Sequence, residues 1–273
     1  MADYAREDLL VEGAWLQEHL NDANLRIVDC DSRDAYRRAH IPGSVFPSDT
    51  FLKNPEDRRF IMRPDQFAAE MRSLGIDDGT LVIAYDQASN TASRMWWALN
   101  YYGHTNVKVL NGGWQQWLAE GRPVSLKPEV HNTAAPFTPK ADESLYATAE
   151  YIMANLENAD VVVWDVRSDG EWDGTVTRGN KRQGHMPGAR HLEWTHNYET
   201  NDLKRWKSTE ALKAQLDAIG VTPDKEVVTV CQGGIRAAQA LFTLKLLGYD
   251  NVRNYDGSFG DWGNREDTPI VTD

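Results

Sequence analysis

The stretch "EVVTVCQGGIRAAQALFTLKLLG", residues 226–248, decides the fold class. Its first residues form a short, apolar, β-branched run of the kind found in strands buried on both faces. A two-glycine loop follows, and from Arg236 an amphipathic helical pattern runs to a closing glycine, Gly248. Strand, loop and helix in this order predict an α/β fold with a parallel sheet covered by helices. Ligands of such sheets bind beyond the carboxyl ends of the strands, where Cys231 stands.

The same unit occurs earlier in the chain. "HIPGSVF" begins at His40 and "HMPGARH" at His185, an offset of 145 residues (185 − 40). No gap is needed over about 78 residues, which is too long a match for chance. Before these turns the offset is 136 residues (165 − 29), from Asp29 to Asp165. The second half therefore has nine extra residues before His185, within "GEWDGTVTRGNKRQG".

This duplication predicts two homologous domains, at residues 1–125 and 146–273. The linker between them, residues 126–145, is rich in proline, alanine and polar residues and shows no periodicity. A length of 273 residues suits two domains of about 100–150 residues each.

The composition argues against several classes of partner. A net charge of −12 disfavours nucleic acid and anionic membranes, and an anionic substrate would need a locally positive site. The first residues, "MADYAREDLL", lack the apolar segment of a signal peptide, and no apolar run approaches the roughly 18–20 residues of a membrane span. Cys30 and Cys231 lie far apart and suggest no disulfide framework. We therefore expect a cytoplasmic protein without nucleic-acid or membrane partners.

The loop after the strand favours a reactive thiolate at Cys231. Gly233 and Gly234 allow several backbone N–H groups to point at one centre. The next helix presents its positive end to the loop, and Arg236 adds a fixed charge. These features predict a nucleophile at Cys231, and a buried structural cysteine is the alternative. Cys30 has no glycine loop and is interpreted as a small, partly buried residue.

The spacing between Cys231 and Arg236 indicates which anion the loop holds. Five intervening residues make a ring that suits a tetrahedral phosphate, whereas this chain has four, which suits a single sulfur atom on the cysteine better. A phosphatase or arsenate reductase is thus the weaker interpretation. The predicted loop residues are Gln232, Gly233, Gly234 and Ile235.

Together these motifs resemble the tandem-domain rhodaneses, the thiosulfate sulfurtransferases, over essentially the whole chain. The resemblance is carried by "HIPGS", "HMPGA", "VWDVRS", "CQGGIR" and "NYDGSFGDWGN". It implies two rhodanese-like domains, each a parallel sheet flanked by helices on both faces. It also implies that Cys231 takes the outer sulfur of thiosulfate as a persulfide, releases sulfite and passes the sulfur to cyanide, a thiol or a thioredoxin-like protein. No metal or other cofactor is implied.

Only the C-terminal domain is usually catalytic in this family, and the repeat agrees. Asp86 stands where Cys231 stands in the second copy, and Thr91 where Arg236 stands. A carboxylate cannot carry sulfane sulfur. We therefore expect an inactive N-terminal domain that covers the active-site mouth, with the Trp96-Trp97 pair facing the domain interface.

The loop also bears on the sulfur donor. Gln232 and Arg236 match the bacterial thiosulfate type better than the mercaptopyruvate branch, whose loop typically reads Cys-Gly-x-Gly-Val-Thr. A 3-mercaptopyruvate sulfurtransferase and a noncatalytic sulfur-binding module remain the alternatives. Vertebrate-type enzymes carry an arginine where this chain has Glu171 and Asp173 around a tryptophan. Candidate substrate cations are therefore sought in the insertion, at Arg178, Lys181 and Arg182, and Trp194 is a candidate pocket wall.

Other polar residues are expected to support the fold. Arg167 should pair with an acid and hold a loop, and Asp165 should orient the loop by hydrogen bonds. His40 and His185 occupy equivalent positions in an active and an inactive domain, so both should stabilise the turn. The seven histidines show no convincing metal spacing.

Overall fold

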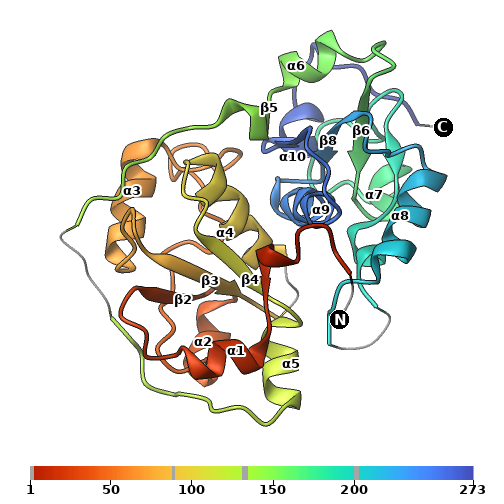
Figure 1. The fold of residues 1–273 in the computed structure, drawn as a ribbon. Coiled ribbons are helices and arrows are strands. Elements are labelled where there is room, and N and C mark those ends of the chain that lie inside the picture. The colour runs from red at the N-terminus through yellow and green to blue at the C-terminus, as the bar shows by residue number, and fades with distance from the viewer. Residues whose placement is uncertain (1–2, 88–89, 131–134, 200–202, 273) are drawn as a thin grey trace.

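Each half of the chain forms its own parallel sheet, and the two domains lie side by side (Figure 1). The computed structural model describes residues 3–87, 90–130, 135–199 and 203–272. The first sheet has the order β1-β4-β3-β2, with β1 Leu10–Val11, β2 Leu25–Asp29, β3 Leu81–Tyr85 and β4 Val107–Leu110. The second has the order β5-β9-β8-β6-β7, with β5 Tyr146–Ala147, β6 Val161–Asp165, β7 Arg190–His191, β8 Glu226–Val230 and β9 Val252–Tyr255. All paired strands of both sheets are parallel.

The helices repeat in the same order in both domains. The first domain has η1 Glu7–Leu9, α1 Gly13–Glu18, α2 Arg33–Arg38, α3 Pro64–Ser73, α4 Asn90–Tyr101 and α5 Gly113–Ala119. The second has η2 Glu143–Leu145, α6 Ala149–Ala154, α7 Asp169–Trp172, η3 Trp194–Asn197, α8 Thr209–Ala218, α9 Ile235–Leu246 and α10 Ser258–Trp262. An offset of 145 places the bounds of β3, β4, α3 and α4 on those of β8, β9, α8 and α9. The predicted duplication is confirmed, and the extra residues follow α7.

Helices cover both faces of each sheet, as predicted. Along β3, Val82 and Ala84 join a core that includes buried residues of α3 and α4. Their neighbours Ile83 and Tyr85 join a second core with residues of α1 and α5. Because both faces of these strands are buried, the strands read as continuous apolar runs in the sequence.

The two domains share one continuous core. α4 and α9 pack against each other across the interface, and Trp96 meets Phe242 edge-on with 5.0 Å between ring centroids. The predicted interface position of Trp96 is confirmed, and Trp97 donates its indole N–H to the carbonyl of Leu145 at 3.1 Å. The two domains are therefore built as one packed unit.

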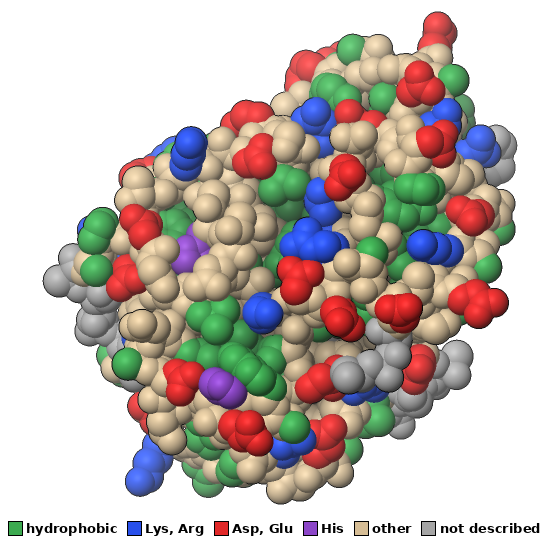
Figure 2. Space-filling view, in the orientation of Figure 1, with side chains coloured by type: hydrophobic (Ala, Val, Ile, Leu, Met, Phe, Trp, Pro, Cys, Tyr) green, Lys and Arg blue, Asp and Glu red, His purple; other side chains and the backbone are tan. Residues whose placement is uncertain are grey.

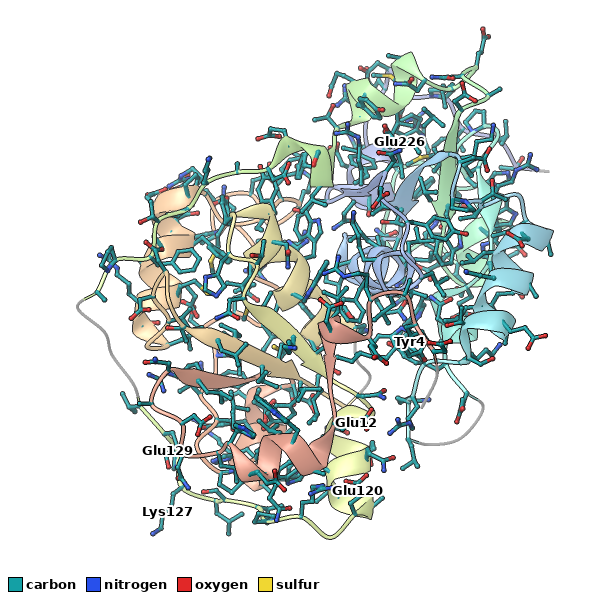
Figure 3. The ribbon with its side chains drawn as sticks, viewed as in Figure 1. Tyr4, Glu12, Glu120, Lys127, Glu129 and Glu226 are labelled. Carbon is teal, nitrogen blue, oxygen red and sulfur yellow. The ribbon has the colours of Figure 1, made fainter. Side chains whose placement is uncertain are left out.

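The segment leading into each domain packs on the other one. The backbone N–H of Arg6 donates to Leu246 at 3.1 Å, and that of Asp142 donates to Tyr101 at 2.7 Å. The Tyr4 hydroxyl also contacts the carbonyls of residues 206 and 207 in the second domain, at 3.1 and 2.9 Å. Figure 3 labels Tyr4 beside that domain. Among the described residues, none of the helices is long and apolar enough to cross a membrane.

Candidate active site

The thiol of Cys231 lies at the carboxyl end of β8, directly before the loop that leads into α9. Its Sγ atom accepts a hydrogen bond from the backbone N–H of Gly234 at 3.1 Å. Cys231 is 1% exposed, so the sulfur is held in a site from which bulk water is largely excluded. Glu226, at the opposite end of β8, is labelled in Figure 3. The predicted position of the thiol at the carboxyl end of a parallel strand is confirmed.

Gly234 is required by both its conformation and its surroundings. Its φ of 79° lies in the left-handed region, which side chains other than glycine rarely adopt. A Cβ atom here would lie 2.4 Å from Oδ1 of Asp256 and 2.6 Å from its carbonyl oxygen. The carbonyl of Gly234 accepts a further hydrogen bond from Asn254 at 3.2 Å. The loop is thus fixed from the β9 side as well as from α9.

Ser258 organises the loop from the start of α10. Its Oγ accepts hydrogen bonds from the backbone N–H groups of Cys231 and Gly234, both at 3.1 Å. The hydroxyl donates to the carbonyl of Tyr255 at 2.7 Å, and its Oγ is 3.9 Å from the cysteine Sγ. Ser258 has a φ of 50°, an uncommon conformation for a serine. Sequence reasoning missed this role, although Ser258 lies in the "NYDGSFGDWGN" motif.

Arg236 forms a bidentate ion pair with Glu171 of α7. Its Nη1 and Nη2 atoms lie 2.7 and 2.8 Å from the two carboxylate oxygens. Burial would raise the pKa of Glu171, but hydrogen bonds from Arg236 and Ser168 lower that pKa to about 2. In spite of burial, Glu171 also raises the pKa of Arg236 above its ordinary value. The loop cation is therefore permanently charged, and its position is fixed by the Glu171 carboxylate, for which the sequence had suggested no such role.

The three cations of the insertion have different environments. Arg178 is largely exposed, and its Nε lies 3.2 Å from Glu171, beside the Arg236 ion pair. Lys181 has an exposed side chain, and its backbone N–H donates to Asn264 at 3.0 Å. Arg182 donates to the carbonyls of residues 262, 265 and 268, so its guanidinium clamps the C-terminal segment. This geometry does not favour the expected substrate contact of Arg182, because oxygen atoms of its own domain occupy its donors.

The insertion also contacts the active-site loop through an amide pair. The side chains of Asn180 and Gln232 exchange hydrogen bonds of 3.1 and 2.9 Å. Asn264 donates to the same Asn180 oxygen at 3.2 Å. Gln232 thus holds the nine-residue insertion against the loop. Ile235 is the first residue of α9, and Gly233 is half-buried beside it.

The remaining polar and aromatic candidate residues contact neighbouring groups of the protein. Arg167 is buried and pairs with an acid as expected; the structure identifies this acid as Asp165, with Nη2 to Oδ2 at 2.7 Å. His40 bonds the carbonyls of residues 36 and 127, and His185 stacks on the Trp172 ring and bonds the carbonyl of the same residue. Trp194 is half-buried, and its ring meets Tyr198 edge-on.

The corresponding loop of the first domain holds a carboxylate instead of a thiol. Asp86 Oδ2 accepts hydrogen bonds from the backbone N–H groups of Thr91 and Ala92 at 2.7 and 2.9 Å, and from the Thr91 hydroxyl. A cavity of about 290 Å³ lies here, and Cys30 lines it. Burial, with Asp86 nearby, raises the pKa of the Cys30 thiol well above its ordinary value, so this second cysteine stays a thiol.

The acidic and histidine side chains give no obvious metal centre. Across the described ranges, no group of three or more His, Cys, Asp or Glu side chains is placed to hold an ion. The groups that the structure places at this site are a thiol, backbone N–H groups and charged side chains.

Comparison with known proteins agrees with this geometry. The family model described as "Rhodanese-like domain" matches residues 12–120 and again 148–265. The chain is 36% identical to the sulfur carrier protein TtuD of Thermus thermophilus, over 98% of each chain. It is 34% identical to a thiosulfate sulfurtransferase of Azotobacter vinelandii, over 99% of each. The solved structure of an anaerobic ergothioneine biosynthesis enzyme from Chlorobium limicola superposes with a TM-score of 0.89 at 25% identity, covering all of this chain and 72% of that one.

Proposed function

The chain belongs to the rhodanese family, and from this premise we propose that it is a thiosulfate sulfurtransferase that carries the transferred sulfur on Cys231. One observation carries the proposal: of the two homologous loops, only the second has a thiol, and that thiol accepts the N–H of Gly234 at 3.1 Å. The first loop has the carboxylate of Asp86 at the same position. We thus assign the chemistry to one of two homologous loops.

The reaction has two nucleophilic steps. The Cys231 thiolate attacks the outer sulfur of thiosulfate, a new S–S bond forms, and sulfite leaves with the electron pair of the old one. An acceptor nucleophile, such as cyanide or a thiolate, then attacks the outer sulfur of the persulfide and releases the thiolate. The enzyme returns to its starting state, so no external oxidant or reductant is needed.

The surrounding groups suit an anionic sulfur at this position. The N–H of Gly234 points at Sγ, and Ser258 fixes the backbone of both loop residues. Arg236 places a permanent cation at the start of α9, whose N-terminus adds a partial positive charge. We assign Arg236 to stabilisation of the thiolate and of the incoming anion. Such pre-placed charges need no reorganisation during the reaction.

The loop and its rim then form the substrate-binding region. We propose this role for Gln232, Gly233, Gly234 and Ile235 as loop residues, for Arg178 and Lys181 as exposed cations, and for Trp194 as a wall. Arg178 and Arg236 both pair with the Glu171 carboxylate, so one positive charge is left over, which favours a small anion such as thiosulfate. The acceptor is proposed to be cyanide, a thiol or a thioredoxin-like protein. A cytoplasmic location belongs to the same proposal, since both cysteines are free thiols.

Mass spectrometry of the intact protein tests the proposal. After incubation with thiosulfate we expect one added sulfur, located on Cys231 by peptide mapping, and its removal by cyanide with formation of thiocyanate. Cys231→Ala should gain no sulfur, while the matched control Cys30→Ala should behave like the wild type. An unmodified wild-type protein would contradict the mechanism. A faster sulfuration by 3-mercaptopyruvate than by thiosulfate would instead assign the alternative donor.

A further inference from the structure

A buried cluster of three charges lies where the two domains meet. The carboxylate of Asp256, in the turn after β9, accepts hydrogen bonds from Lys53 Nζ at 2.9 Å and from Arg94 Nη1 at 2.5 Å. The side chains of Lys53 and Arg94 are 4% and 0% exposed, and both belong to the N-terminal domain. Two cations around one anion leave a net positive charge in a place that water barely reaches.

This cluster touches the active-site loop itself. A Cβ atom on Gly234 would lie 2.4 Å from Oδ1 of Asp256, so the carboxylate contacts the residue whose N–H donates to Cys231. Burial lowers the pKa of Lys53 to about 8, against the attraction of Asp256 and of a Cys231 thiolate. Lys53 therefore remains a cation at neutral pH and acts on the sulfur electrostatically.

The segment that carries Lys53 is anchored to the second domain. Lys53 Nζ also donates to the carbonyl of Arg59 at 2.8 Å, and the Arg59 guanidinium pairs with Asp261 at 2.8 Å. The charged groups around Lys53 and the loop, from all the elements involved, include Asp57, Arg59, Arg94, Glu171, Arg236, Asp256 and Asp261. The position of Lys53 is therefore set by contacts between the domains.

We propose that the N-terminal domain is an electrostatic part of the active site, with Lys53 and Arg94 as positioning residues. They neutralise Asp256, which would otherwise repel the thiolate and an anionic donor, and they leave one positive charge beneath the loop. Such a charge is needed because the chain carries −12 overall, and Figure 2 shows acidic side chains over the visible face of both lobes. The identity of the donor rests on the proposed function, but the effect on an approaching anion does not.

Alkylation of Cys231 by a charged and a neutral reagent measures this effect. Iodoacetate is an anion and iodoacetamide is neutral, so the ratio of their rates reports the local potential, and peptide mapping confirms the modified cysteine. In Lys53→Met we expect the ratio of the iodoacetate rate to the iodoacetamide rate to fall about tenfold, because the field of a unit charge near a buried site is weakly screened. Lys53→Arg should retain the ratio. Lys213→Met, which removes an exposed lysine of α8, is the matched control and should also retain it.

A double variant separates charge from structure. Lys53→Met with Asp256→Asn leaves Arg94 as the one charge of the cluster, so the wild-type ratio should return. An equal slowing of both reagents in Lys53→Met, or no recovery in the double variant, would overturn the proposal.

The wild-type protein supplies an independent test if a variant fails to fold. Between pH 7 and 9 its ratio should fall as Lys53 loses its proton near pH 8, and a constant ratio would also refute the proposal. Alkylation needs no sulfur transfer, so these outcomes are separate from failure of the proposed function.

Discussion

Replacement of Glu171 by glutamine should destabilise the protein in a pH-dependent way. The Glu171 carboxylate accepts hydrogen bonds from both terminal nitrogens of the Arg236 guanidinium, and the Glu171 side chain is 1% exposed. Burial would raise its pKa, yet Arg236 and Ser168 lower the pKa to about 2 from an ordinary value of 4.5. A tenfold change in the proton affinity of a group is worth about 1.4 kcal/mol. The lowering of the Glu171 pKa on folding therefore corresponds to about 3 kcal/mol of stability at pH 7.

The sign of the pH dependence follows from the direction of that pKa. A carboxyl whose pKa is depressed by folding contributes fully above its unfolded value and loses its contribution as pH falls toward its folded value. We expect Glu171→Gln to lower the free energy of unfolding by about 3 kcal/mol at pH 7 and by about 1.4 kcal/mol at pH 3. Urea titrations of wild type and variant, followed by tryptophan fluorescence at several pH values, measure this difference.

A matched carboxylate in the same helix provides the control. Asp169 is 95% exposed and faces His191 at 2.9 Å, so Asp169→Asn should change the free energy of unfolding by less than about 0.5 kcal/mol. A cost below about 1 kcal/mol for Glu171→Gln at pH 7 would refute the reasoning, because a buried arginine without its partner should be expensive. A cost that stays the same from pH 7 to pH 3 would refute it equally.

Two further substitutions test the loops. Gly234→Ala should abolish sulfur uptake and lower the melting temperature by several degrees, because its Cβ would collide with Asp256. The control Gly121→Ala, at a φ of 64° with open space around it, should lower the free energy of unfolding by only about 1 kcal/mol. Equal melting temperatures of the two variants would contradict this. Asp86→Cys should gain no sulfur from thiosulfate in mass spectrometry, because Thr91 supplies no cation; sulfuration at position 86 would mean that a thiol in the loop is sufficient.

The duplication could be predicted from the sequence because equivalent residues of the two halves recur at a constant spacing. Glycines and tryptophans that recur at one offset fix the turns and cores of both copies, and α4 and α9 have equivalent bounds. The position of Cys231 at a strand end followed from the same local pattern. These are short-range features, which propensity and periodicity describe well.

The charge network could not be predicted because it depends on tertiary packing. Glu171 and Arg236 are 65 residues apart, and Lys53 reaches Asp256 from the other domain. One local signal was available: Ser168 and Glu171 have the spacing of a capping box, which places that glutamate in the first turn of a helix. Arg182 illustrates the same limit. A cation in a loop near the site suggested substrate binding, but in the structure its guanidinium donates to backbone carbonyls, which disfavours that role.

The two homologous loops differ in what satisfies their backbone N–H groups. In the first domain the Asp86 carboxylate accepts two backbone N–H groups and the Thr91 hydroxyl, so this loop holds a fixed anion of its own. In the second, Sγ of Cys231 accepts one N–H of the loop, and the nearby charges come from Arg236 and from Lys53 of the other domain. An anion-binding loop satisfied by its own carboxylate stabilises the domain, whereas one that ends in a thiol can accept and release sulfur. If Cys231 carries the sulfur as proposed, the first copy needs no reactive thiol and can contribute Lys53 and Arg94 to the surroundings of the second loop.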